Sequence, residues 1–431
     1  MPNQNQEILF YLPITKQWLE QYALVHFQQG TSYRGIIYSF ETLFDLKRSI
    51  GWCHNTIYNA AGKAQILQET ENLSKIEVSA NDEVFDGSKP ILTSVCTNSL
   101  YCPLLKKADD RKAETWETVL KKLMNEHSYN PHSCILDGST SLQAGHKQAL
   151  ENATIIYDTF HITSDFKDMK RFVNNQLKSA KTNLNTINGK LEKAKDAQKI
   201  QKLNNQKTYA QRKYNKALAL YQTIATLDSW FQYDILKVAG YDYQTRYDLL
   251  QFIASELERV EKEMPHRIQS VRKTLQTKAD KILGFVKNLE AELVSHADML
   301  GCNVYWLWKL CYAQRYDKNG NAYYQYITPI IKRLKHKFYE TENAVIAIMN
   351  EIEKASSVVE NLNGRIRKFL MNHIHVSQDV LDLLRLIINH REFERSRCEH
   401  RQGKSPAKVL HEQNHQHWLE MLGYKLFKQA A

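Results

Sequence analysis

Three acidic side chains in this sequence stand at places from which a fold could bring them together. Asp82 follows an alternating apolar run, Asp137 ends a short apolar run, and Glu360 lies near the start of an amphipathic helix. Carboxylates that converge in this way can hold two Mg²⁺ ions, which stabilise the attacking and leaving oxygens of a phosphodiester displacement. The three acids therefore indicate phosphoryl-transfer chemistry.

Each of these acids also has a structural interpretation, as a turn residue or a helix cap. Ser357 and Glu360 have the spacing of a capping box. Asp82 competes with Glu83 and Asp86 as the ligand from its strand. Strand alternation places Glu83 on the opposite face, and Asp86 falls in a turn. The assignment then depends on the elements that position the acids.

Alternating and continuous apolar runs predict five strands and two helices between residues 76 and 157. We expect strands at 76–84, 90–97, 100–106, 133–136 and 153–157, and helices at 113–124 and 141–151. Three hairpin-linked strands followed by helix, strand, helix and strand is the order of a ribonuclease-H-like sheet. In that sheet the first and fourth strands are adjacent and parallel, which would place Asp82 beside Asp137.

The amino-terminal region predicts a pair of helices. Thr31 can cap a helix that runs to about residue 46, with Ile36, Phe40 and Leu43 or Phe44 turned inward, and a second helix spans about 55–67. A helix, a Gly-containing turn and a helix form the outline of a helix-turn-helix, whose second helix enters the major groove of DNA. Its exposed DNA-contacting residues would be Asn55, Thr56, Tyr58, Asn59 and Lys63.

A long helical segment follows the predicted sheet. Apolar residues spaced by three and four over 166–191, and again over 260–293, predict two long helices packed against each other as a coiled coil, with smaller helices between them. Trp306 and Trp308 lie among tyrosines and basic residues. They could stack on unpaired bases, or they could anchor the helical core.

Composition narrows the class of protein. The formal net charge is +11 and 43% of residues are hydrophobic, which indicates a folded protein that favours polyanions such as nucleic acid. Seven scattered cysteines without a CxxC pair argue against a disulfide framework and a structural zinc site. The amino terminus lacks the pattern of a signal peptide, and no apolar run has the length of a membrane span. We therefore expect a cytoplasmic protein without a membrane partner.

Several segments resemble DDE transposases of bacterial insertion sequences. The resemblance lies in 82–85 with 89–92, in 110–116, in 136–138, in 160–161, and most distinctively in Ser356–Asn363 followed by Asn389–Phe393. Further matches are 395–397, 403–406 and 417–423. The resemblance covers 75–163 and 355–425, and it is only general over the amino-terminal helices.

The resemblance implies that Asp82, Asp137 and Glu360 form the DDE triad, binding two Mg²⁺ ions that Mn²⁺ can replace. It implies hydrolysis at the transposon ends and transfer of the freed 3′-hydroxyl into target DNA. Double-stranded DNA, as terminal inverted repeats and as target, would be the partner of a homodimer or larger assembly associated with the nucleoid. Some relatives carry a helical insertion with a tryptophan that holds a flipped base, and Trp306 or Trp308 would be the counterpart. Residues that could orient the acids or contact phosphate are His161, Asp158, Asn363, Arg365 and Arg367, and the basic tail adds Arg395, Arg397 and Lys404 as DNA contacts.

The expected architecture is therefore α/β plus all-α. A helix-turn-helix-like domain (1–70) precedes a ribonuclease-H-like core of five mixed strands (71–163 and 355–395). A helical coiled-coil insertion (164–354) interrupts this core, and a basic tail (396–431) follows it. Two other functions remain open: a ribonuclease-H-like nuclease or resolvase that does not join strands, and a non-catalytic DNA-binding or DNA-bridging protein.

Overall fold

The computed structural model describes residues 14–352, 357–373, 375–396 and 398–426. The chain forms two compact units, which are described separately below. Unit 1 comprises residues 1–153 and 357–431, and unit 2 comprises residues 154–356. None of the helices within the described ranges combines the length and the apolar character that crossing a membrane requires.

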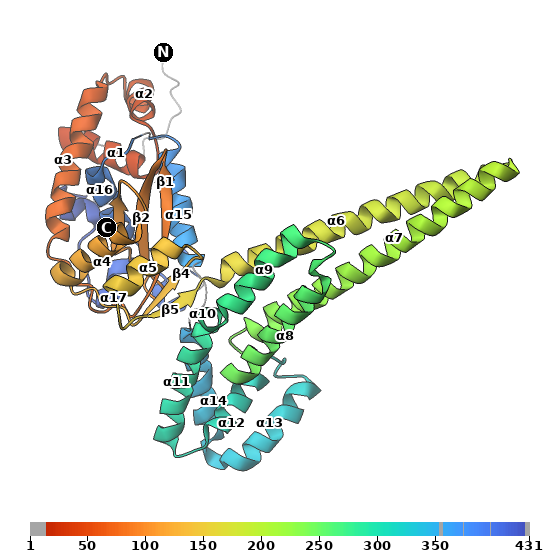
Figure 1. The fold of residues 1–431 in the computed structure, drawn as a ribbon. Coiled ribbons are helices and arrows are strands. Elements are labelled where there is room, and N and C mark those ends of the chain that lie inside the picture. Colours follow the sequence, from red (N-terminus) through yellow and green to blue (C-terminus); the bar gives the residue numbers. More distant parts are fainter. Residues whose placement is uncertain (1–13, 353–356, 374, 397, 427–431) are drawn as a thin grey trace, which may run out of the picture. The chain divides into compact units, whose positions relative to one another are not determined.

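Five strands form one mixed sheet in the order β3-β2-β1-β4-β5 (Figure 1). Their bounds are β1 Val78–Asp86, β2 Lys89–Cys96, β3 Leu104–Lys107, β4 Ser133–Leu136 and β5 Thr154–Tyr157. β1 pairs antiparallel with β2 and parallel with β4, and β2 pairs antiparallel with β3. The predicted strand order and the parallel pairing of the first and fourth strands are confirmed, and the sheet is compatible with a ribonuclease-H-like fold.

Helices of unit 1 pack on this sheet. Their bounds are α1 Lys16–Gln28, α2 Tyr33–Phe44, α3 Ile50–Gln68, α4 Ala113–His127, α5 Thr140–Ala149, α15 Ser357–Leu370, α16 Gln378–His390, α17 Pro406–His411 and α18 Trp418–Met421. α15 contacts β1 and β2, and α16 contacts β3 and α3. The helix that carries Glu360 is thus held against the strand that carries Asp82.

The amino-terminal helices differ from the prediction in detail. Ser32, rather than Thr31, caps α2. Ser49 caps α3, which begins at Ile50, five residues before the expected start. Ile36 and Phe40 are buried as predicted and Phe44 is half-buried, whereas Leu43 is 64% exposed. Thr56 was expected to be exposed, but it is buried and its hydroxyl donates to the Trp52 carbonyl, because it lies on the face of α3 that packs into unit 1.

Unit 2 is helical beyond β5. Its helices are α6 Thr159–Glu192, α7 Ala197–Trp230, α8 Tyr243–Glu261, α9 Pro265–Thr277, α10 Ala279–Ile282, α11 Gly284–Leu300, α12 Val304–Ala313, α13 Asn321–Leu334 and α14 Phe338–Glu351, with a π-helical turn at Phe231–Ile235. Most of its buried apolar side chains form two clusters, which span 157–286 and 289–345.

The predicted pairing of the two long apolar series holds only in part, because the start of α6 contacts α9 and shares a core cluster with it, whereas the main partner of α6 is α7. α6 packs along α7, to which a short turn connects it, and the two form a long helical hairpin (Figure 1). The 260–293 series is not one helix but forms α9, α10 and α11 with the end of α8. Pro265 begins α9, and Gly284, which begins α11, lies against Ile156 so closely that an added Cβ would be 3.2 Å from its side chain. Both breaks therefore fall where a proline or a close approach to a strand stops a continuous helix.

Candidate active site

Asp82 and Asp137 occupy matching positions on the parallel strands β1 and β4. The register joins Ala80 to Ile135 and Asn81 to Leu136, so Asp82 and Asp137 are the next residues along the two strands. Adjacent parallel strands are about 4.8 Å apart, and their carboxyl ends meet at one edge of the sheet. Asp82, in the middle of β1, and Asp137, just after β4, are therefore neighbours at the carboxyl end of β4.

Asn363 of α15 ties Asp82 to the helix that carries Glu360. Its Nδ2 donates to Oδ2 of Asp82 at 2.7 Å. The hydroxyl of Thr93 lies 3.1 Å from Asn363 Oδ1 and 2.9 Å from the backbone carbonyl of Asp82. Asn363 is fully buried, so this link fixes α15 against β1.

The electrostatics around Asp82 show that the three acids share one environment. The pKa of Asp82 is raised from 3.8 to about 6, mainly by burial. A hydrogen bond from the Glu83 backbone opposes this shift, and the negative charges of Glu360, Asp137 and Glu83 add to it. The neighbouring carboxylates contribute less to the raised pKa than burial does, and a cation bound beside them would offset their negative charge.

Glu83 and Asp86 have other roles. The indole Nε1 of Trp116, on α4, donates to Glu83 Oε1 at 3.0 Å, so Glu83 lies on the face of the sheet away from α15. Asp86 is buried, pairs with Lys107 at 2.8 Å and accepts from the backbone of Val376. Both rivals of Asp82 are therefore engaged in packing the core.

Basic side chains accompany Glu360 on α15. Nη1 of Arg367 lies 3.4 Å from Glu360 Oε2. Arg365 lies beside a cleft of about 380 Å³ that Arg391 and Arg395 also line. Lys404 is half-buried, and its backbone carbonyl accepts from Phe393. Arg397 and the side chain of Ser357, the proposed partner of Glu360 in a capping box, lie outside the described residues.

His161 and Asp158 lie in unit 2, at the start of α6. Asp158 caps the helix by accepting from the backbone of Phe160, and its other carboxylate oxygen is 2.6 Å from Nδ1 of His161. Asp158 is fully buried and His161 is half-buried, so the carboxylate orients the imidazole ring.

Of the five α3 residues expected to contact DNA, Asn55, Tyr58 and Asn59 are exposed as predicted and Thr56 is not. Lys63 is exposed, and its Nζ donates to the carbonyl of Leu422 at 2.8 Å. This contact ties α3 to the carboxyl-terminal segment.

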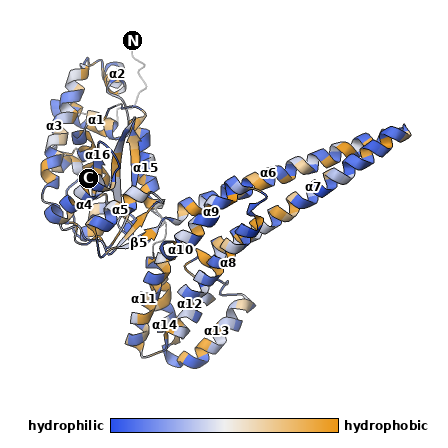
Figure 2. Ribbon diagram, viewed as in Figure 1, coloured by the Kyte–Doolittle hydropathy of each residue, from blue (hydrophilic) through white to orange (hydrophobic). Residues whose placement is uncertain are grey.

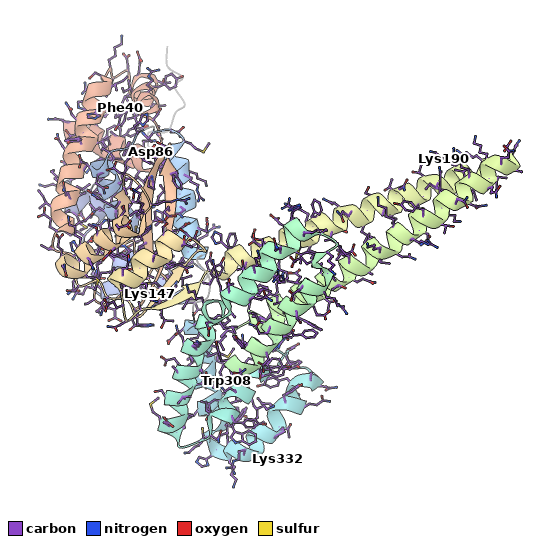
Figure 3. All side chains as sticks on the ribbon, viewed as in Figure 1. Phe40, Asp86, Lys147, Lys190, Trp308 and Lys332 are labelled. Atoms are coloured by element: carbon purple, nitrogen blue, oxygen red, sulfur yellow. The ribbon has the colours of Figure 1, made fainter. Side chains whose placement is uncertain are left out.

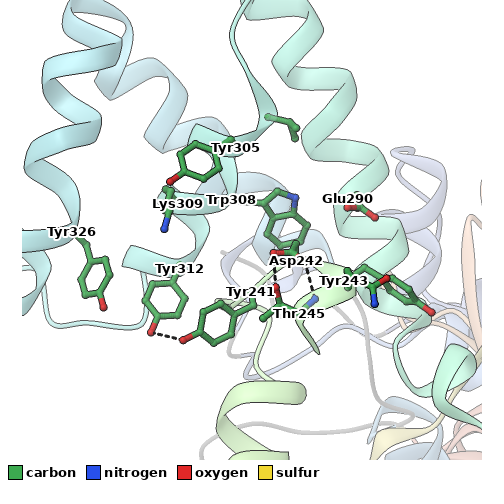
Figure 4. Close-up of a pocket in the computed structure, with 13 residues that line it drawn as sticks. Tyr241, Asp242, Tyr243, Thr245, Glu290, Tyr305, Trp308, Lys309, Tyr312 and Tyr326 are labelled. Atoms are coloured by element: carbon green, nitrogen blue, oxygen red, sulfur yellow. Dashed lines mark hydrogen bonds between the residues drawn. The ribbon is translucent and has the colours of Figure 1, made fainter. Parts of the chain in front are cut away.

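Both tryptophans of α12 are half-buried against the core of unit 2. Trp308 also lines a cavity of about 720 Å³ whose wall contains Tyr305, Tyr312 and Tyr326 (Figure 4). Trp306 does not line it. The structure therefore gives Trp308 both of the surroundings that the sequence left open, a core contact and an aromatic cavity.

Thr93 is the one residue of this site that sequence reasoning missed. The hairpin turn after Asp86 sets the register of β2 against β1, and counting back from Asp86↔Lys89 pairs Asp82 with Thr93. The turn was predicted, so the position opposite Asp82 was open to the same reasoning.

The donor set fits a hard divalent cation in its chemistry, since it consists of carboxylate oxygens in a negative field. Over the described residues, however, no group of three His, Cys, Asp or Glu side chains is gathered closely enough to hold a metal ion. The acids are thus near enough to interact through their charges, without the spacing of a formed metal site.

Comparison with known protein families gives a match. Residues 82–298, half of the chain, match the ISL3 family model of DDE transposases, which is described as Transposase. The match begins at Asp82 and includes Asp137. A search of curated proteins finds no match. On the family match, this chain belongs to the ISL3 family of DDE transposases.

Proposed function

We propose that this transposase cuts DNA at the ends of its element and joins the freed 3′-hydroxyl to target DNA, using Asp82, Asp137 and Glu360 as the acidic triad. The observation that carries the proposal is the environment of Asp82. The β1–β4 register places Asp137 beside it, and both Asp137 and Glu360 raise its pKa. The Asn363 link holds the Glu360 helix in place.

These three carboxylates would hold Mg²⁺, or Mn²⁺ in its place. Bound there, a pair of divalent ions would activate water or a 3′-hydroxyl as nucleophile and stabilise the charge on the phosphate. Because Asp82 has a pKa of about 6, it is mostly ionised at neutral pH and becomes protonated in mild acid. Its capacity as a ligand should therefore fall as the pH drops below about 6.

Other side chains of the chain would orient the acids and hold the DNA. Asn363, which accepts from Thr93, holds the carboxylate of Asp82, and Arg367 restrains Glu360. Arg365 and Arg395 line one cleft with Arg391, where guanidinium groups suit backbone phosphates.

Further DNA contacts remain proposals. We assign them to the exposed residues of α3 (Asn55, Tyr58 and Asn59) and to Lys404, to His161 at a phosphate, and to Trp308 for stacking on an unpaired base. Because cutting and joining act on two ends held together, the active form would be a homodimer or a larger assembly.

The test is cleavage and joining of a labelled duplex that carries the element's own end, with Mg²⁺, for Glu360→Gln. We expect normal binding of the end and a loss of both reactions by at least about a hundredfold, since a lost metal ligand removes several kcal/mol of transition-state stabilisation. Glu83→Gln is the matched control, because glutamine can still accept from Trp116 and this side chain faces away from α15. It should cleave nearly as well as the wild type.

Three outcomes would contradict the proposal. Cleavage by Glu360→Gln at the wild-type rate would remove Glu360 from the triad. Cleavage by the wild type that never joins a pre-cut end to target DNA would indicate a nuclease, and binding with no cleavage at all would indicate a non-catalytic DNA-binding protein.

A further inference from the structure

The α6–α7 hairpin carries most of the net charge of the chain. Residues 159–230 contain 14 Lys and Arg against 5 Asp and Glu, so they hold 9 of the 11 net positive charges. The other 359 residues are nearly balanced. Net charge concentrated on one element is the electrostatic footprint of a polyanion-binding surface.

The distal part of the hairpin, residues 172–227, has a still more one-sided composition. Its only acids are Glu192 and Asp196, both at the turn, and there is no acid from 197 to 227. It also contains 14 Asn and Gln side chains, which can donate to phosphate oxygens without adding negative charge. Solvated helix faces usually mix both signs of charge, and this surface does not.

Most basic side chains of the distal hairpin face no counter-charge among the described residues. Ten distal Lys and Arg side chains are exposed and form no ion pair within the described part of the chain: Lys178, Lys181, Lys190, Lys193, Lys195, Lys199, Lys202, Lys207, Arg212 and Lys213. Lys190 projects near the tip (Figure 3). Lysines that form ion pairs lie nearer the start of the hairpin, where Lys170 contacts Asp228 and Lys216 contacts Glu263.

The distal part of the hairpin buries few apolar side chains, so burial of hydrophobic surface does not explain its length. Its distal buried cluster consists of Leu184, Ile187 and Ala210, with Tyr214 packed beside it. Both helices are hydrophilic over much of their length (Figure 2). Each has 34 residues, so at about 1.5 Å per residue the hairpin extends about 50 Å, more than one turn of duplex DNA.

One stripe of α7 shows the surface at residue level. Lys202, Gln206, Tyr209 and Lys213 are spaced by four, three and four, so they follow one face of the helix. All four are exposed, and the ring of Tyr209 is 71% exposed. The two lysines and the glutamine amide of this stripe can bind backbone phosphates, and the tyrosine ring lies beside them.

We propose that the α6–α7 hairpin is a second DNA-binding surface, which grips the backbone of duplex DNA without reading its sequence. The type of basic side chain supports backbone binding. Of the 14 Lys and Arg residues in 159–230, 12 are lysines, which bind phosphate as point charges. Reading guanine favours the bidentate fork of arginine. This inference rests on the proposed function only for the identity of the polyanion as DNA.

The test measures binding of the full-length protein to a 30-base-pair duplex of arbitrary sequence, by fluorescence anisotropy over a range of salt concentrations and without divalent metal. The variant carries Lys202→Gln, Lys207→Gln and Lys213→Gln. We expect weaker binding and a salt dependence of log K that is shallower by about two to three units, because each lost phosphate contact removes nearly one unit of slope. The triple Lys→Arg variant should restore both quantities.

The control removes the same charge elsewhere in unit 2, through Lys262→Gln, Lys273→Gln and Lys332→Gln, all exposed in the wild type. This variant should keep the wild-type slope within about one unit. Equal losses in the two triple variants would overturn the proposal, because the effect would then come from net charge alone. Wild-type binding by the hairpin variant, or tighter binding of single strands than of duplex by the wild type, would overturn it as well.

The outcome is distinguishable from failure of the proposed function. Binding is measured without metal, so it does not depend on the acidic triad. If the hairpin binds DNA while Glu360→Gln cleaves normally, the triad is wrong and the hairpin surface stands. If the hairpin variant binds DNA like the wild type while Glu360→Gln does not cleave, the hairpin proposal is wrong and the triad stands.

Discussion

Asp82 shows how the neighbours of a residue decide its chemistry. Its pKa in the folded chain, about 6, lies above the ordinary value of 3.8, so folding favours the protonated form. Ionised Asp82 therefore opposes folding above pH 6, and its contribution to stability improves as the pH falls from about 7 towards 4.

Asp82→Asn should consequently stabilise the metal-free protein at pH 8, by about 1–2 kcal/mol, and change its stability little at pH 4. Urea unfolding of wild type and variant in the presence of a chelator, at both pH values, measures the difference. Mg²⁺ added at pH 8 should raise the melting temperature of the wild type but not of the variant. An equal effect of the substitution at both pH values would contradict the raised pKa.

Asn363 acts through Asp82, and its contribution can be separated from general stability. Asn363→Ala should lower cleavage by roughly 10–100-fold and raise the Mg²⁺ concentration needed for half-maximal cleavage, since it frees the carboxylate it now holds. Thr93→Val, which removes the hydroxyl beside Asn363, should shift the metal requirement in the same direction by less. A loss of activity with an unchanged metal requirement would show that Asn363 only stabilises the fold.

At the scale of elements, the packing of α4 on α5 supports one face of the sheet. A Cβ on Gly145 of α5 would lie 2.6 Å from both the Ala113 carbonyl and the Cβ of Trp116. Trp116 is the residue that binds Glu83, so this close approach of two helices also places the indole.

Gly145→Ala should therefore destabilise unit 1 by about 1–3 kcal/mol through overpacking. Gly62, exposed on α3 with no atom within 4 Å of an added Cβ, is the matched position. Gly62→Ala should stabilise by about 0.5–1 kcal/mol, because alanine is the better helix former. The melting temperatures of the two variants should move in opposite directions, and a stable Gly145→Ala variant would refute the close packing.

Unit 2 also contains an arginine whose role is purely structural. Arg246 is fully buried and donates to the backbone carbonyls of Tyr241, Ile235 and Val238, between the π-helical turn and α8. A buried guanidinium with satisfied donors can organise an irregular connection that has few side chains of its own to pack.

At the scale of the molecule, the chain is built from two units of different character. Unit 1 is discontinuous and holds Asp82, Asp137 and Glu360, whereas unit 2 is continuous and encloses its own hydrophobic clusters. A segment that buries its own apolar surface has what it needs to fold alone.

We expect the fragment 154–356 to form a helical, cooperatively melting domain that binds duplex DNA with strong salt dependence and cleaves nothing. Circular dichroism and anisotropy measure these properties. The fragment with Lys202, Lys207 and Lys213 changed to Gln is the control, and it should melt like the parent while binding more weakly. A fragment without cooperative melting would contradict the independence of unit 2.

The sequence by itself determined that there are five strands, although the third begins at Leu104 and not at residue 100, and that the first and fourth are parallel neighbours, which places Asp82 beside Asp137. Alternation of apolar residues fixes which face of a strand is buried, and the order of elements leaves few ways to join the strands. It also determined that the helix of Glu360 is amphipathic and that Asn363 shares its polar side. These conclusions needed only local pattern and short connections.

Tertiary structure decided which surfaces meet. The spacing over 166–191 shows that α6 buries one face, but periodicity does not identify the helix that covers this face. The sparse apolar residues of α7 gave a weaker helical pattern than residues 260–293 did. The short turn between α6 and α7 settled the pairing. For the same reason Thr56 could not be assigned as buried, because its burial depends on the helices that pack on α3. Nor could Thr93 be assigned as a partner of Asn363, because that contact joins two elements whose approach depends on the packed fold.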